Sequence, residues 1–109
     1  MNSVVITGAS GFIGRHLVSY LVQQNIDGYA ITRNKNSCLS RIPKTPQLHI
    51  VVGDYVTEDL YQELPQNPSA FLHLAWSGVQ DQERSAPEVQ TANLSYCLNA
   101  VALAERLHA

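Results

Sequence analysis

Three glycines at a fixed spacing constrain this chain more than any other feature. Residues 7–14 read TGASGFIG and lie between a β-branched run at residues 3–7 and a helical pattern at residues 12–24. Gly8 permits a tight turn out of a strand, Gly11 lets backbone approach a pyrophosphate, and Gly14 lets the helix pack closely on the sheet. The N–H groups of the first helical turn then face the anion. This pattern predicts a phosphate-binding turn, and the alternative is a purely structural glycine-rich turn.

Short β-branched runs alternate with helical stretches along the chain. We expect strands at residues 3–7, 28–32, 48–52 and 70–74, and helices at 12–24, 58–64 and 87–108. Such alternation gives parallel β-α-β units with right-handed crossovers. The expected fold is therefore α/β, a Rossmann-type doubly wound parallel sheet represented by its first four strands in the order 3-2-1-4, with flanking helices. We expect one domain, residues 1–109, that is the N-terminal portion of a larger sheet.

Two helices carry apolar residues at helical spacing. In the first helix these residues are Phe12, Ile13, Leu17, Val18, Leu21 and Val22. In the last helix Leu94, Leu98 and Val101 share one face. The first stripe predicts an amphipathic helix, and we expect the apolar face of the last helix to lack its usual cover.

Composition excludes several classes of partner. The net charge of −2 and the absence of a basic cluster argue against binding to nucleic acid or an anionic membrane. Cys38 and Cys97 lack metal-ligand spacing, so no metal site is expected. Without a basic leader or an apolar run of about 18 residues, we expect a cytoplasmic protein.

The glycine motif resembles that of the extended short-chain dehydrogenase/reductase superfamily, specifically the NAD-dependent epimerase/dehydratase family. The resemblance covers essentially all 109 residues. It implies that acidic Asp54, with Tyr55, contacts adenine after the third strand, the alternative being that Asp54 is an ordinary turn or cap residue. It also implies that the end of the fourth strand passes beside the cofactor. Asn93 matches an asparagine common in the family's long helix. The implied cofactor-binding residues are Gly8, Ser10, Gly11, Phe12, Ile13, Gly14, Arg33, Asp54, Tyr55, Leu74, Ala75, Trp76 and Asn93.

Members of this family mostly act on nucleotide sugars through transient oxidation by a bound nicotinamide. The resemblance implies that the chain is the NAD(P)-binding part of a nucleotide-sugar epimerase, dehydratase or reductase and is inactive alone. The family's Tyr-x-x-x-Lys pair does not occur in these residues, so we assign no catalytic residue. Two alternatives are a stand-alone regulatory module that binds a nicotinamide nucleotide and a structural dimerisation domain.

Cofactor preference depends on the residues that follow the second strand. NAD-binding versions of this fold place an acid there to bond the ribose 2′-hydroxyl. Here the stretch is Thr32-Arg33-Asn34-Lys35, and arginine pairs with a phosphate. We therefore favour NADP over NAD, the alternative being that Arg33 and Lys35 are solvated loop cations.

Two further expectations concern the fourth strand. His73 lies within an apolar run, where a hydrogen-bonded core histidine is favoured over a base. The strand would have an open edge, which favours pairing with another chain. The family resemblance implies a homodimeric contact through the last helix, so we expect a homo-oligomer.

Overall fold

A parallel sheet of four strands organises the molecule. The computed structural model describes residues 2–9, 11–32, 42, 44–53, 58–75 and 87–109. The strands are β1 (Ser3–Thr7), β2 (Asp27–Thr32), β3 (Leu48–Val52) and β4 (Ala70–His73). Their order across the sheet is β3-β2-β1-β4, and every pairing is parallel. The predicted α/β fold and strand order are confirmed.

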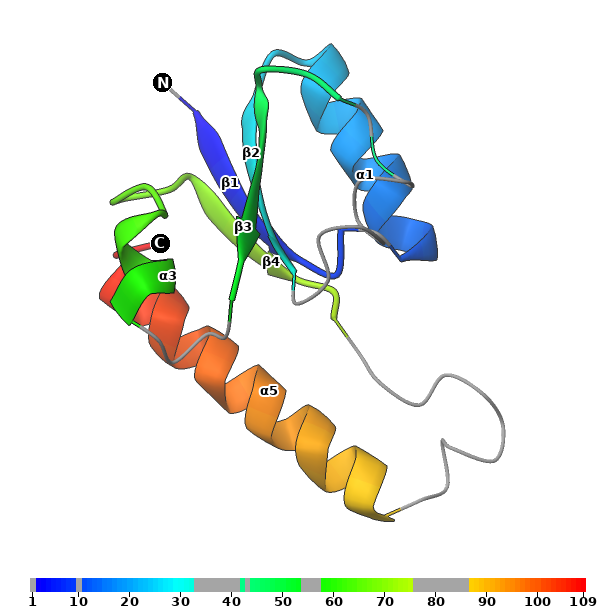
Figure 1. Cartoon of the computed structure of the whole chain (residues 1–109), viewed down its shortest axis with the longest axis vertical. Helices are drawn as coiled ribbons and strands as arrows, with labels where there is room; N and C mark the ends of the chain where they lie inside the picture. Colours follow the sequence, from blue (N-terminus) through cyan, green and yellow to red (C-terminus); the bar gives the residue numbers. More distant parts are fainter. Residues whose placement is uncertain (1, 10, 33–41, 43, 54–57, 76–86) are drawn as a thin grey trace.

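Helices cover both faces of this sheet. Helix α1 (Phe12–Gln23) lies on one face, and α3 (Glu58–Gln62) and α5 (Pro87–Arg106) lie on the other (Figure 1). Because β side chains alternate between faces, Val4 and Ile6 of β1 join the core beneath α1, whereas Val5 joins the core beneath α5. This explains why the strands read as continuous apolar runs: both of their faces are buried.

The ends of the elements follow the predictions with small shifts. Helix α1 stops at Gln23 and is followed by Asn25 in the left-handed region, with a φ of 58°. Asparagine tolerates that conformation better than most residues, as the sequence indicates. Helix α3 is shorter than predicted and ends at Gln62, and β4 ends one residue early, at His73. Strand β2 begins at Asp27, one residue before the predicted start.

The apolar stripe predicted for α1 is wrong at its first turn. Val18 and Leu21 are buried against the sheet, but Phe12 is 73% and Ile13 is 68% exposed. The small residue Gly14 occupies the buried position in this turn instead. Close packing of the helix on the turn leaves no room for a large side chain there.

Helix α5 buries a different side from the one that its large apolar residues mark. Asn93, Ala100 and Leu103 are buried, whereas Leu94, Leu98 and Val101 are exposed. Among the described strands, β4 pairs only with β1, so its other edge is open.

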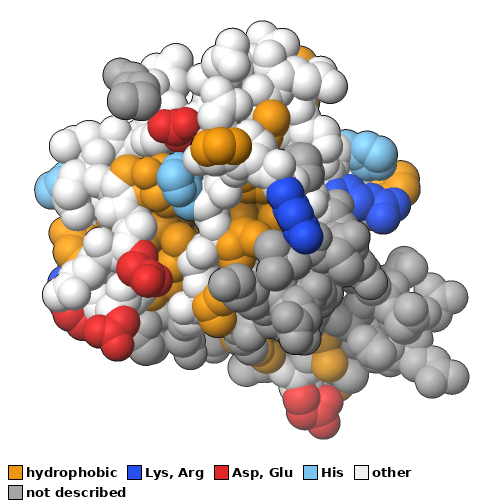
Figure 2. Space-filling view, turned by 45° about the horizontal axis from the view of Figure 1, so that its top comes forward, with side chains coloured by type: hydrophobic (Ala, Val, Ile, Leu, Met, Phe, Trp, Pro, Cys, Tyr) orange, Lys and Arg blue, Asp and Glu red, His pale blue; other side chains and the backbone are white. Residues whose placement is uncertain are grey.

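The described surface mixes apolar and charged side chains. On the face drawn in Figure 2, hydrophobic side chains gather near the middle, and charged side chains are scattered singly or in small groups. Within the described part of the chain, no helix has the length and apolar character needed to cross a membrane.

Candidate functional site

The glycine-rich turn joins the end of β1 to the start of α1. Gly8 adopts a φ of +74°, which glycine reaches without the steric cost of a side chain. The turn is closed by the Gly11 N–H, which donates to the Gly8 carbonyl at 3.1 Å. Gly11 is the N-cap of α1, and no side chain of the described residues caps the helix there. The first N–H groups of α1 have no partner within the helix, so they remain available to an acceptor outside it.

The three glycines are required for different reasons. A Cβ on Gly8 would lie 2.6 Å from the Ala75 nitrogen, and a Cβ on Gly14 would collide with the Gly8 carbonyl oxygen. Among the described residues, a Cβ on Gly11 would meet one atom, that same oxygen, at 3.3 Å, a tight contact that a shift of a few tenths of an ångström would relieve, and the Gly11 backbone is in the extended region. The fold therefore requires Gly8 and Gly14, whereas a Cβ on Gly11 needs only a small shift of one atom in the described part of the chain. This is the difference expected if glycine at position 11 serves the close approach of a ligand to the backbone.

The turn lies where the strand order reverses. The chain runs outward from β1 through β2 to β3, then returns to place β4 on the other side of β1 (Figure 1). Ligands of doubly wound sheets bind beyond the carboxyl ends of the strands at such a point. Thr7 of β1 pairs with His73 of β4, so the glycine turn and residues 74–75 emerge side by side.

Exposed side chains surround the start of α1. Phe12 packs edge-on against His16, with ring centroids 5.4 Å apart, and the Arg15 guanidinium lies 5.4 Å from the Phe12 ring centroid. Arg15 adds positive charge to the helix end whose dipole already favours an anion. The backbone of this turn, more than its side chains, offers the contacts that a phosphate needs.

A hydrogen-bonded cluster joins the ends of β1 and β4. Thr7 is fully buried, and its Oγ1 lies 2.7 Å from Nδ1 of His73. The same oxygen accepts from the N–H groups of Leu74 and Ala75, at 3.1 and 3.2 Å. Desolvation by burial lowers the pKa of His73 below 6.5. The interpretation of His73 as a hydrogen-bonded histidine, and not a base, agrees with this geometry.

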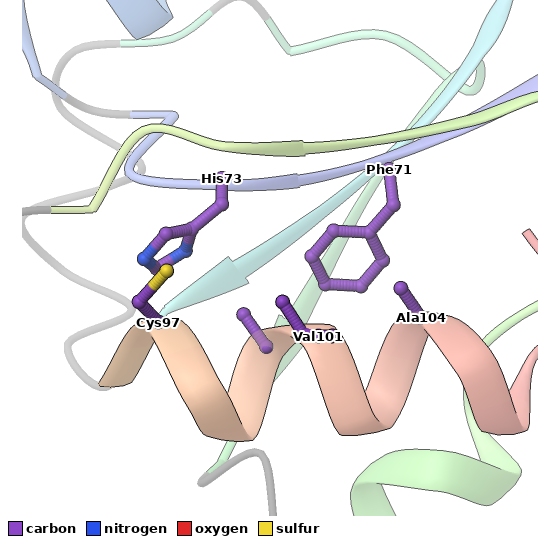
Figure 3. Close-up of a pocket in the computed structure, with 6 residues that line it drawn as sticks. Phe71, His73, Cys97, Val101 and Ala104 are labelled. Carbon is purple, nitrogen blue, oxygen red and sulfur yellow. The ribbon is translucent and has the colours of Figure 1, made fainter. Parts of the chain in front are cut away.

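His73 also lines a small pocket between β4 and α5. Figure 3 shows its imidazole and the Cys97 side chain turned toward each other across a cavity of about 140 Å³. The other lining residues are Phe71, Ala100, Val101 and Ala104. Within the described ranges, no three His, Cys, Asp or Glu side chains are grouped to hold a metal ion.

The structure brings together most of the predicted site residues that it describes. Gly14 packs against Gly8 and Ala9 of the turn, and Gly8 packs against Leu74 and Ala75. The Leu74 N–H donates to the Thr7 carbonyl at 3.0 Å. Asn93 is fully buried on α5, on the opposite face of the sheet from α1, and so is not part of the turn. The remaining predicted residues, Ser10, Arg33, Asp54, Tyr55 and Trp76, lie outside the described residues.

Sequence reasoning missed the role of Thr7. The motif includes this residue, but its side chain was given no function. A signal was present in the strand ends: Thr7 is the last residue of β1 and His73 is the last residue of β4. Since these parallel strands are neighbours, the two residues lie opposite each other. A hydroxyl and an imidazole at paired positions on one face of a sheet indicate a hydrogen bond.

The strand order and flanking helices define an α/β protein with a Rossmann-like fold. The NAD dependent epimerase/dehydratase family model matches residues 4–109, and the chain belongs to that family. Among curated proteins, no sequence matches the chain at a significant level.

Solved structures share this fold over about a third of their length. The epimerase Mth375 from Methanothermobacter thermautotrophicus is 21% identical with a TM-score of 0.78, and the match covers 97% of this chain and 32% of that one. WbmH from Bordetella bronchiseptica, in complex with NAD+, is 23% identical with a TM-score of 0.75, covering 99% and 36%. A UDP-N-acetylglucosamine 4-epimerase from Methanobrevibacter ruminantium M1, in complex with UDP-N-acetylmuramic acid, is 22% identical with a TM-score of 0.77, covering 98% and 35%.

Proposed function

We propose that this chain holds the pyrophosphate of a nicotinamide dinucleotide in the turn between β1 and α1. The observation that carries the proposal is the contrast among the glycines. A Cβ on Gly8 or Gly14 would collide with neighbouring backbone, whereas a Cβ on Gly11 would meet one atom of the described residues, the Gly8 oxygen, at 3.3 Å. A glycine that packing does not require is explained by a ligand that approaches the backbone there.

The residues present fit such a cofactor. The N–H groups at the start of α1, at Phe12, Ile13 and Gly14, would bind the phosphates, and the helix dipole would favour their charge. Residues 74–75, fixed beside Gly8, would form the neighbouring wall. Asp54 and Tyr55 would contact the adenosine end, as the family resemblance implies. The bound nicotinamide would supply reversible hydride transfer.

Nucleotide sugars are the proposed substrate class. Support comes from the family and from structural neighbours described as UDP-sugar epimerases. No tyrosine in the sequence is followed by lysine four residues later, and the chain spans about a third of the length of those neighbours. We therefore assign these residues the role of holding the cofactor, and we expect no turnover of a nucleotide sugar from them alone.

NADP is the proposed cofactor in preference to NAD. The sequence that follows β2 contains Arg33 and Lys35 and lacks an acid that could bond a ribose 2′-hydroxyl. A guanidinium pairs bidentately with a 2′-phosphate, which NADP has and NAD lacks.

We further propose that the chain self-associates. Leu94, Leu98 and Val101 form an exposed apolar stripe on α5, each more than half exposed. Among the described strands β4 pairs only with β1, so its outer edge could pair with a strand of another chain. A rise in molar mass with concentration in analytical ultracentrifugation is expected. A monomer at all concentrations would contradict the proposal.

An equilibrium titration with NADP and with NAD tests the cofactor site. We expect saturable binding of NADP, weaker binding of NAD, and loss of both in Gly11→Val, whose side chain would occupy the pyrophosphate position. Ala102→Val is the matched control, because it adds bulk at an exposed position of α5, away from the turn. Equal affinity of Gly11→Val and the control would refute the phosphate-turn assignment.

A further inference from the structure

The Thr7 hydroxyl has three partners at hydrogen-bonding distance. A threonine hydroxyl has one hydrogen to donate and two lone pairs to accept with. The N–H groups of Leu74 and Ala75 can only donate: the Ala75 N–H donates to this oxygen, and the Leu74 N–H is shared between it, at 3.1 Å, and the Thr7 carbonyl, at 3.0 Å. They occupy its accepting capacity, so its single hydrogen is left for Nδ1 of His73, 2.7 Å away.

This assignment points to one protonation state of the imidazole, although it places the hydrogen on Nε2, a buried nitrogen for which the described part of the structure shows no hydrogen-bond acceptor. When Nδ1 accepts a hydrogen bond, a neutral ring carries its hydrogen on Nε2. A hydrogen on Nδ1 would bring a third donor to an oxygen that already accepts two. Burial acts in the same direction, since it disfavours the charged ring and lowers the pKa of His73.

The cluster also fixes the peptide that borders the glycine turn. Strand β4 ends at His73, so the Ala75 N–H lies beyond the ladder and bonds to the Thr7 side chain. From the other side, Gly8 approaches this peptide so closely that a Cβ on Gly8 would lie 2.6 Å from the Ala75 nitrogen. Thr7 and Gly8, adjacent in sequence, therefore hold residues 74–75 by a hydrogen bond and by contact.

We infer that Thr7 and His73 are positioning residues that fix the Leu74–Ala75 wall of the cofactor site, with His73 held as the neutral Nε2–H tautomer. His73 thereby takes no part as a proton acceptor from a ligand, because its Nδ1 lone pair is used by Thr7. The link to a cofactor rests on the proposed dinucleotide function, whereas the tautomer and the wall position do not.

Nitrogen-15 NMR of the histidine rings of the whole chain tests the tautomer. We expect His73 to show a protonated Nε2 and an unprotonated, hydrogen-bonded Nδ1 near neutral pH. His16, His49 and His108 are exposed and provide internal references for mixed tautomers. A hydrogen on Nδ1 of His73, or the mixture shown by the references, would overturn the assignment.

Amide hydrogen exchange tests the positioning role without any ligand. In Thr7→Val, which keeps the shape but removes the hydroxyl, the Ala75 amide should exchange at least about tenfold faster. Thr7→Ser should retain its protection, and Thr45→Val, which removes a turn hydroxyl bonded to the Gln47 N–H, is the control. Unchanged exchange at Ala75 in Thr7→Val would overturn the inference.

A second pair of variants serves if Thr7→Val does not fold. In His73→Asn the amide oxygen can accept from Thr7 in place of Nδ1, whereas His73→Leu cannot accept. We expect Ala75 to stay protected in His73→Asn and to lose protection in His73→Leu, and equal exchange in the two would count against the cluster. If the wild type binds no dinucleotide, the proposed function fails while the tautomer and exchange results still decide this inference.

Discussion

Replacing Gly8 by alanine should destabilise the fold severely. The residue has a φ of +74°, where an L side chain costs about 1–2 kcal/mol. The new Cβ would lie 2.6 Å from the Ala75 nitrogen and from the Leu74 carbonyl carbon, and backbone cannot swing aside as a side chain can. Overpacking of this kind costs about 1–3 kcal/mol. The free energy of unfolding should therefore fall by about 2–5 kcal/mol, a large share of a typical domain's stability.

Urea denaturation followed by circular dichroism measures this loss, and Gly11→Ala is the matched control. Gly11 is extended, and within the described residues its Cβ would meet one atom, the Gly8 oxygen, at 3.3 Å, which a shift of a few tenths of an ångström relieves. The control should change the free energy of unfolding by less than about 1 kcal/mol. Similar losses in the two variants would refute the reasoning, because the turn would then need both glycines for packing.

Three further predictions concern the cofactor, the histidine and the surface. Arg33→Asp should shift the ratio of NADP to NAD affinity toward NAD by about tenfold or more, measured by calorimetry, and an unchanged ratio would exclude Arg33 as the discriminator. Because the folded pKa of His73 is lowered, the unfolded chain binds its proton more readily, so stability should fall as pH drops below 6.5. Among the described residues that line the pocket beside His73, Cys97 is the other titratable side chain. The variant His73→Asn, which lacks the imidazole, should show a smaller pH dependence of the urea midpoint. Leu98→Asp should weaken self-association in ultracentrifugation while changing stability by less than about 0.5 kcal/mol.

The strand order could be predicted because several independent patterns agreed. Residues 3–7 and 48–52 are short, β-branched and bounded by turn residues, and their observed bounds match the predicted ones. Asn25 marked the end of α1 because few residues tolerate its left-handed backbone. Parallel strands with helices between them leave little freedom in topology, so the fold followed from local signals.

Periodicity alone could not identify which helix face is buried. Phe12 and Ile13 fit the apolar stripe of α1, but tight packing against the turn selects Gly14 for the buried position. On α5 the sheet buries Asn93 and leaves Leu98 exposed. A large apolar side chain indicates that a surface becomes covered, without indicating whether the sheet or a partner covers it.

The site was predictable where it depends on backbone and less so where it depends on side chains. Glycine spacing indicated the turn because a Cβ on Gly8 or Gly14 would collide with neighbouring backbone. The Thr7–His73 bond depends on the register between β1 and β4, which are separated by more than sixty residues in sequence. No local pattern encodes such a pairing until the topology is known.

A backbone amide NMR titration with NADP tests the central claim most directly, because it reports where the ligand binds. The account predicts saturable shifts at the amides of Gly11, Phe12, Ile13 and Gly14, with smaller shifts at Ala75 and none at α3. Saturable shifts confined to other parts of the sheet or to α5, or none at millimolar NADP, would contradict it.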